Sequence, residues 1–170
     1  FFPNTVQSGL DPNIVEGFDG VDPYSGERND SEWSARVQID FQPNDDKLMY
    51  ASWNRGVKSG GFNAPLLPTA EFVTDELMNY GPERLDAYEI GVKYTFADGR
   101  ARINAAAYYY DYKQCQVFSI IGLDTFTLNG DCKSKGFEVE AMASPVTGLD
   151  MQIGLGYVDA EVEYQWSDPV

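Results

Sequence analysis

Alternation of apolar and polar residues is the dominant pattern in this chain, and it recurs in several long stretches. A period of two is typical of β-strands, because successive side chains on a strand point to opposite faces. The pattern predicts six strands, at about residues 32–42, 48–57, 86–97, 100–113, 133–144 and 151–163. No stretch of similar length has the period of an α-helix, so we expect an all-β protein.

The connections between these strands are alternately short and long. The short ones consist of turn-forming residues and are Pro43–Asp46, Asp98-Gly99 and Pro145–Asp150. The long ones are polar and irregular, and comprise residues 1–31, 58–85, roughly 114–132 and those after about 159. An up-and-down barrel of the bacterial outer membrane has this order, with tight periplasmic turns at one end and long external loops, here including 1–31, at the other.

A two-residue turn at Asp98-Gly99 predicts the register of the strands on either side. A type I′ turn there places Ala97 opposite Arg100, and all later pairs follow from it. The apolar side chains then meet one another, in the pairs Tyr94/Ile103, Val92/Ala105, Ile90/Ala107 and Tyr88/Tyr109. The polar side chains do the same, in the pairs Thr95/Arg102, Lys93/Asn104 and Glu89/Tyr108. One turn thus sorts both strands into an apolar face and a polar face.

The other two short turns are not equally informative. For the Pro145–Asp150 turn, pairing Ala143 with Met151 also aligns the apolar faces, as Val139/Leu155 and Phe137/Tyr157. For the strand at 48–57 the alternation leaves two choices. The outward face carries either Leu48, Tyr50 and Ser52 or Met49, Ala51 and Trp53.

A membrane barrel and a soluble β-sandwich both require alternating strands. The predicted strands are longer than the five or six residues common in soluble sheets, and match the roughly ten needed to cross a membrane at a tilt. Polar residues opposite the apolar faces suit a water-filled lumen, and tyrosines near strand ends suit an interfacial girdle. We therefore expect an antiparallel up-and-down transmembrane β-barrel segment. Because bacterial barrels need about eight strands or more, residues 1–170 should form one partial barrel domain.

Composition excludes several classes of function. The chain has 12 Lys plus Arg against 27 Asp plus Glu, a net charge of −15 and no histidine. This balance argues against nucleic-acid binding, which depends on surplus cations. No apolar stretch approaches the roughly 18 residues of a membrane-spanning helix. Without histidine, the commonest general base and zinc ligand are missing, and we expect neither a metal site nor a cofactor.

Acidic residues raise two further possibilities. Glu138 and Glu140 share one strand face about 7 Å apart, a spacing compatible with a glycosidase pair. With no sugar-stacking cleft evident, we expect no catalytic residues and no enzyme. The acidic residues Asp19, Asp22, Glu27 and Asp30 could chelate divalent cations, although a solvated acidic surface is the simpler interpretation.

The predicted polar faces supply the candidate site residues. Those expected to face the lumen are Glu89, Lys93, Arg102, Asn104, Glu138 and Glu140. They would contact a plug or a passing ligand, or simply solvate the wall. Cys115 and Cys132 flank the connection between two consecutive strands, so in a hairpin they come close, and we expect them to form a disulfide.

Three segments resemble TonB-dependent outer-membrane receptors, in that family's order and over roughly residues 30–163. They are Leu48 to Asn63; Tyr80-Gly81-Pro82-Glu83 followed by Tyr88 to Lys93; and Asn129-Gly130 followed by Lys135 to Glu140. The resemblance implies energy-coupled uptake of a scarce, bulky nutrient, often a ferric siderophore, across the outer membrane of a Gram-negative bacterium. Members of the family have a barrel of roughly 22 strands filled by an N-terminal plug.

The resemblance also implies the partners of this chain. They are outer-membrane lipid, the remainder of the barrel, its plug, TonB acting through that plug, and the cargo. The chain itself carries no plug, no TonB-contacting box and no barrel C-terminus, so we expect a piece of the barrel wall that transports nothing alone. Two alternatives remain open: a soluble secreted β-domain that binds a carbohydrate or a protein, and a passive porin.

Overall fold

A computed structural model of the protein describes residues 26–65, 74–121 and 124–163. They form one six-stranded sheet, in the order β1-β2-β5-β6-β7-β8, and a small two-stranded sheet of β3 and β4. All strand pairs are antiparallel. The large strands are β1 (Ala35–Asn44), β2 (Lys47–Lys58), β5 (Glu83–Phe96), β6 (Ala101–Ile121), β7 (Asp124–Val146) and β8 (Leu149–Glu163). The sheet is open at β1 and β8, as a part of a larger barrel is.

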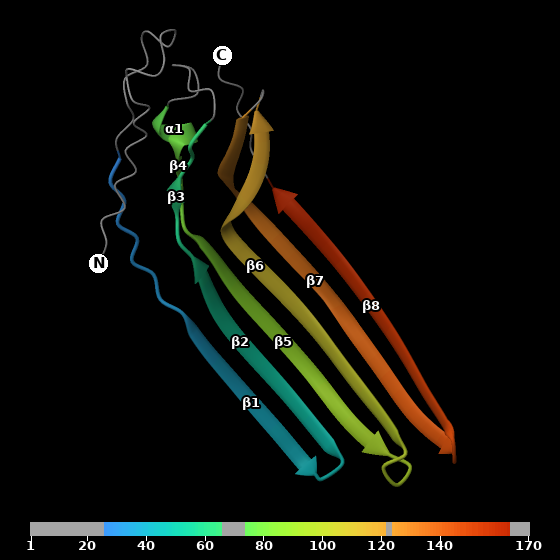
Figure 1. Ribbon diagram of the computed structural model, residues 1–170. Helices are drawn as coiled ribbons and strands as arrows, with labels where there is room; N and C mark the ends of the chain where they lie inside the picture. The colour runs from blue at the N-terminus through green and yellow to red at the C-terminus, as the bar shows by residue number, and fades with distance from the viewer. Residues whose placement is uncertain (1–25, 66–73, 122–123, 164–170) are drawn as a thin grey trace.

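The two ends of the sheet differ (Figure 1). Short turns join β1 to β2, β5 to β6 and β7 to β8 at one end. At the other end lie β3 (Gly61–Phe62), the single-turn helix α1 (Asp75–Met78) and β4 (Asn79–Tyr80). The predicted short connections therefore lie at one end of the sheet, and the predicted long connections lie at the other end. No helix among the described residues is long and apolar enough to cross a membrane.

The predicted registers of two hairpins are confirmed. The Arg100 N–H donates to the Ala97 carbonyl at 3.1 Å, and Asp98 and Gly99 have φ values of 54° and 83°, as a type I′ turn requires. All seven pairs predicted from this turn occur, from Thr95/Arg102 to Tyr88/Tyr109. The three pairs predicted for the β7–β8 hairpin occur as well.

The structure also decides which face of β2 is apolar. Val37 pairs with Trp53, Ile39 with Ala51 and Phe41 with Met49, so Met49, Ala51 and Trp53 join the apolar face of β1. The same three residues continue the apolar face of β5, opposite Val92, Ile90 and Tyr88. Tyr50 and Ser52 therefore belong to the polar face.

The apolar face is not covered by any described element. Ile39 is 68% exposed, Ile90 63% and Ile153 71%, although all three lie within long, regular strands. A soluble β-sandwich would bury these side chains between two sheets, whereas the described residues form a single layer. We call the exposed part of this face between Phe96 and Tyr88 the apolar band. It is about 26 Å long along the strand, which corresponds to a height of about 20 Å for a strand tilted by 40°, close to the height of the apolar band of outer-membrane barrels.

Aromatic and charged rows border this band on the side of the long connections. Trp53, Tyr88 and Tyr109 lie opposite one another on adjacent strands, with 6.4 Å between the Tyr88 and Tyr109 ring centroids. Two residues further along each strand, Arg55 pairs with Asp86 at 2.6 Å. This order of apolar band, aromatic row and charged row is the one expected across a membrane interface.

The segment at 114–132 differs from the irregular loop that the sequence predicts. β6 continues to Ile121 and β7 begins at Asp124, and the two pair along this whole length. A bulge between Tyr112 and Cys115 shifts the register, and Gln114 in it has a φ of 54°. Because of the extra residue, the odd-numbered residues of β6 lie on the apolar face before the bulge and the even-numbered residues lie on that face after it. The alternation seen before residue 113 therefore does not continue after it.

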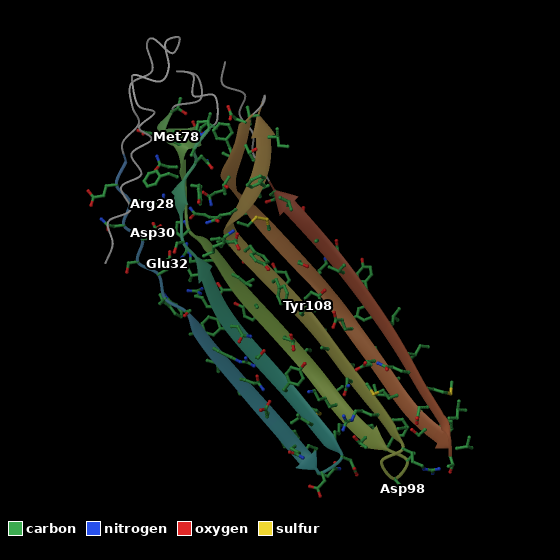
Figure 2. The ribbon with its side chains drawn as sticks, in the orientation of Figure 1. Arg28, Asp30, Glu32, Met78, Asp98 and Tyr108 are labelled. Carbon is green, nitrogen blue, oxygen red and sulfur yellow. A yellow bond between two sulfur atoms is a disulfide. The ribbon has the colours of Figure 1, made fainter. Side chains whose placement is uncertain are left out.

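We call residues 114–121 and 124–132 the hairpin extension, residues 59–65 and 74–82 the arch, and the two together the cap. Figure 2 shows the cap at the end of the sheet around Met78, away from the Asp98 turn. The buried residues of the described chain all lie in the cap. They are Gly61, Asn63, Met78, Cys115, Asp124, Phe126 and Leu128.

Candidate functional site

The polar face of the sheet carries all six residues that the sequence assigns to a lumen. Four of them, Lys93, Asn104, Glu138 and Glu140, line a shallow hollow of about 130 Å³ together with Tyr50. The hollow is formed by β2, β5, β6 and β7, because the register brings side chains of the same face into one row across these strands. That this face lines the lumen of a closed barrel remains a prediction.

Hydrogen bonds connect the polar face across strands. Asn104 donates to Glu140 at 3.2 Å, and Gln152 on β8 donates to the other oxygen of Glu140 at 2.6 Å. The carboxylate of Glu140 thus holds three strands together. Both of its oxygens accept hydrogen bonds from side-chain amides. This arrangement suits a carboxylate that stabilises the polar face rather than one that acts with Glu138 as a catalytic pair.

Glu89 and Arg102 complete the predicted set. The Tyr50 hydroxyl donates to Glu89 at 2.7 Å, from β2 to β5. Arg102 lies opposite Thr95 near the turn end, with a long contact of 3.5 Å to its hydroxyl. The alternation of β2 leaves its polar face undecided, so the sequence alone does not predict Tyr50 as a partner of Glu89.

Glycines on the polar face make room for tyrosine rings. A Cβ atom on Gly91 would collide with the Tyr50 ring, and one on Gly136 would collide with the Tyr157 carbonyl and the Tyr108 hydroxyl. Tyr108 also stacks on Tyr110, with 4.8 Å between ring centroids. The half of this face nearer the cap therefore carries Tyr108 and Tyr110, and the charged residues of the hollow lie nearer the short turns.

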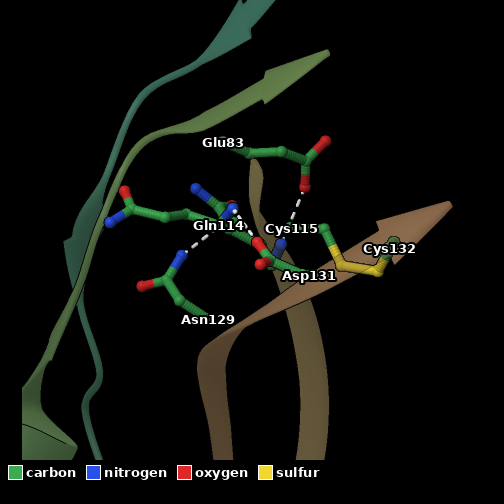
Figure 3. Close-up of a disulfide and its surroundings, with 7 residues drawn as sticks. Glu83, Gln114, Cys115, Asn129, Asp131 and Cys132 are labelled. Carbon is green, nitrogen blue, oxygen red and sulfur yellow. Dashed lines mark hydrogen bonds between the residues drawn. A yellow bond between two sulfur atoms is a disulfide. The ribbon is translucent and has the colours of Figure 1, made fainter. Parts of the chain in front are cut away.

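The disulfide expected from the sequence is present in the structure (Figure 3). Cys115 and Cys132 are bonded, with 5.9 Å between their Cα atoms. The bulge makes this possible, because it turns Cys115 to the same face of the hairpin as Cys132. The chemical test is alkylation without reductant: an intact bond leaves both thiols unlabelled in mass spectrometry.

Amide side chains surround the disulfide and connect the cap. Asn129 donates to the Gln114 carbonyl at 2.7 Å, and the Gln114 N–H donates to Asp131 at 3.3 Å. The Gln116 N–H donates to Glu83 at 2.8 Å. No sequence pattern predicts these contacts, because each joins residues at least 15 positions apart in the chain.

Asp30, near the start of the described chain, contacts both a neighbouring residue and the arch. Asp30 accepts from Arg28 at 2.7 Å and from the Gly60 N–H at 3.2 Å, and the Arg28 hydrogen bond lowers the pKa of the Asp30 carboxyl. Asp19 and Asp22 lie outside the described residues. Within the described residues, no group of three or more carboxylates or thiols is placed to hold a metal ion.

Comparison with known proteins agrees with this architecture. The model of the family described as "TonB dependent receptor-like, beta-barrel" matches residues 7–169. A curated relative from Acinetobacter baumannii, described as "Probable TonB-dependent siderophore receptor PiuA", is 24% identical over 82% of this chain and 18% of its own length.

Two solved structures share the fold. The ferric yersiniabactin uptake receptor FyuA from Yersinia pestis has a TM-score of 0.63 and 23% identity, over 82% of this chain and 20% of that one. The ferric-catecholate import receptor Fiu from E. coli has a TM-score of 0.56 and 14% identity, over 94% and 23%. The chain thus spans about a fifth of the length of these proteins. With its six-stranded antiparallel sheet, exposed apolar band and matching family model, the chain belongs to the TonB-dependent receptor-like β-barrel family.

Proposed function

We propose that this chain is part of the barrel wall of an outer-membrane receptor that takes up a scarce nutrient, such as a ferric siderophore, using energy transmitted by TonB. The family of the chain is one of transport receptors rather than enzymes. The intact protein would act in the outer membrane of a Gram-negative bacterium. Its contact with TonB would run through a plug domain outside this chain.

The observation that carries the proposal is the division of one sheet into two different faces. One face exposes isoleucines between an aromatic row and a short-turn end, as hydrocarbon requires. The opposite face presents amides, carboxylates and Lys93 around a hollow. Such a face can hydrogen-bond a plug or a passing cargo, and we assign it this role.

The names of the relatives support the choice of cargo. PiuA is described as a siderophore receptor, and FyuA and Fiu as receptors for ferric yersiniabactin and a ferric catecholate. A ferric siderophore is therefore the first cargo to test for the intact protein. These names differ in cargo chemistry, and the chain itself does not select one of them.

The test is uptake of radioactive iron by cells that express the full-length receptor as their sole siderophore receptor. Ferric catecholate and ferric yersiniabactin are supplied separately, to hosts with and without TonB. We expect uptake of at least one complex in the TonB-containing host only. Uptake that persists without TonB would instead support a passive porin, and liposome swelling by the purified protein would confirm that alternative.

A pair of variants tests the part played by this chain. Lys93→Gln removes the cation of the hollow, and we expect slower uptake at equal receptor abundance. The matched control is Lys135→Gln, because Lys135 lies on the opposite face in an exposed ion pair with Asp159. Equal uptake by both variants would argue against a role of the polar face in transport.

A further inference from the structure

Two asparagines join the arch and the hairpin extension by the same geometry in opposite directions. Asn63, in the arch, donates to the Thr127 carbonyl and accepts from the Thr127 N–H, both at 2.8 Å. Asn129, in the extension, donates to the Gly81 carbonyl at 3.1 Å and accepts from the Gly81 N–H. Each side-chain amide thus satisfies both backbone groups of one residue, as a neighbouring strand would.

The Asn63 contact lies in the interior of the cap. Asn63 is only 7% exposed, and its amide also donates to the Leu77 carbonyl at 2.7 Å. Its backbone N–H donates to the Met78 carbonyl at 2.8 Å. Because unmade hydrogen bonds of buried groups are costly, separating the arch from the extension would leave several polar groups unsatisfied at once.

Gln116 adds a third connection, to both ends of the arch. Its side chain donates to the Ser59 carbonyl at 2.8 Å and to the Gly81 carbonyl at 3.1 Å. Gly81 therefore receives contacts from two amide side chains of the extension. Ser59 and Gly81 lie at the two ends of the arch, so both ends are bound to one residue of β6.

Asn129 also connects this system to the base of the extension. Its amide donates to the carbonyl of Gln114 in the bulge, beside the Cys115–Cys132 disulfide. Figure 3 shows Asn129, Gln114 and the disulfide together, and among the described residues β6 and β7 pair only with each other beyond this point. A substitution of Asn129 would therefore remove hydrogen bonds to both the arch and the bulge.

We propose that the arch and the hairpin extension form one cooperative unit, so that the two segments separate from each other in a single step. The hydrogen bonds of Asn63 and Asn129 are the contacts that couple them. The two segments belong to different external connections, so separate motion would be the default expectation for loops. The reciprocal amide contacts make the opening of one depend on the other. The proposal concerns the cap alone and holds whatever cargo the receptor carries.

The test is amide-resolved hydrogen exchange on the full-length receptor in nanodiscs. Asn63→Asp replaces the donor at Asn63 by an oxygen facing two carbonyls, and we expect about tenfold faster exchange of the Thr127 N–H. In a cooperative unit the Gly81 N–H, which Asn129 holds, accelerates by a similar factor. Acceleration of Thr127 alone would overturn the proposal.

Two further variants complete the design. Asn129→Asp should accelerate Thr127 as well as Gly81, and it serves as the independent measurement if Asn63→Asp does not fold. Asn54→Asp is the matched control, because among the described residues the Asn54 side chain hydrogen-bonds only to Ser52 on its own strand, at 3.4 Å. We expect it to leave both amides unchanged, and acceleration of both amides by this control would overturn the specific role of Asn63 and Asn129.

Discussion

The cap and the rest of the six-stranded sheet differ in whether they bury apolar side chains. Within the sheet, Ile39 and Ile153 are 68% and 71% exposed, whereas in the cap Phe126 is 0% and Met78 2% exposed. The cap therefore has a small core of its own and dense internal hydrogen bonding. The sheet depends on its surroundings, which we take to be hydrocarbon on one face and a plug or cargo on the other. The same chain thus contains one region that exposes its apolar side chains and one that buries a small apolar core of its own.

The largest effect expected from this comparison concerns the core of the cap. Phe126→Ala should destabilise the cap by about 3–5 kcal/mol, because a fully buried phenylalanine loses its contacts and leaves a cavity. Hydrogen exchange of the cap amides measures this local loss. The control is Phe118→Ala in the same hairpin extension, where the side chain is 75% exposed and we expect almost no change. Equal effects would show that the cap has no core.

The second prediction compares one substitution in the two regions. Ile90→Arg should destabilise the folded receptor by about 2–4 kcal/mol, the range for arginine near the bilayer midplane. Ile120→Arg should change stability by less than about 0.5 kcal/mol, since Ile120 lies in the cap. Ile90 and Ile120 are similarly exposed, at 63% and 76%. Denaturant unfolding in lipid bilayers measures both, and equal costs would argue that the band does not face hydrocarbon.

A smaller effect on stability is expected from adding a methyl group to the polar face, at a crowded position and at an open one. Gly91→Ala places a methyl group against the Tyr50 ring and should cost about 1–2 kcal/mol, because the ring must move away from Glu89. Gly154→Ala, where no atom lies within 4 Å of the added carbon, should be close to neutral. The same unfolding measurement applies. A neutral Gly91→Ala would indicate that Tyr50 is not held in this position.

The smallest effect concerns pH and the contact between Asp30 and Gly60. Because Arg28 lowers the pKa of Asp30 in the folded protein, the contact contributes stability above the ordinary aspartate pKa of about 4. That contribution, under about 1 kcal/mol, is lost as pH falls through the lower folded pKa. Exchange of the Gly60 N–H, corrected for intrinsic pH dependence, should therefore rise in acid. Asp30→Asn should remove this change, and an unchanged acid response in that variant would assign it to another group.

Much of the sheet was predictable because its signals are local. Alternation with a period of two identifies a strand within a few residues, and the turn at Asp98-Gly99 then sets every pair between β5 and β6. The apolar and polar faces follow without knowledge of any distant contact. The six polar-face candidates were accessible for the same reason, although Tyr50 and Gln152, which bind two of them, were not.

The sequence by itself determined the strands, two registers and the division into an apolar and a polar face, because these depend on neighbours in the chain and on short turns. Only the tertiary structure decided the face of β2, the bulge at Gln114 and the contacts of Asn63 with Thr127. Each of these depends on a partner on another strand or in another connection. A bulge moreover reverses the alternation itself, so the extension of β6 and β7 past residue 113 is hidden from any pattern of period two.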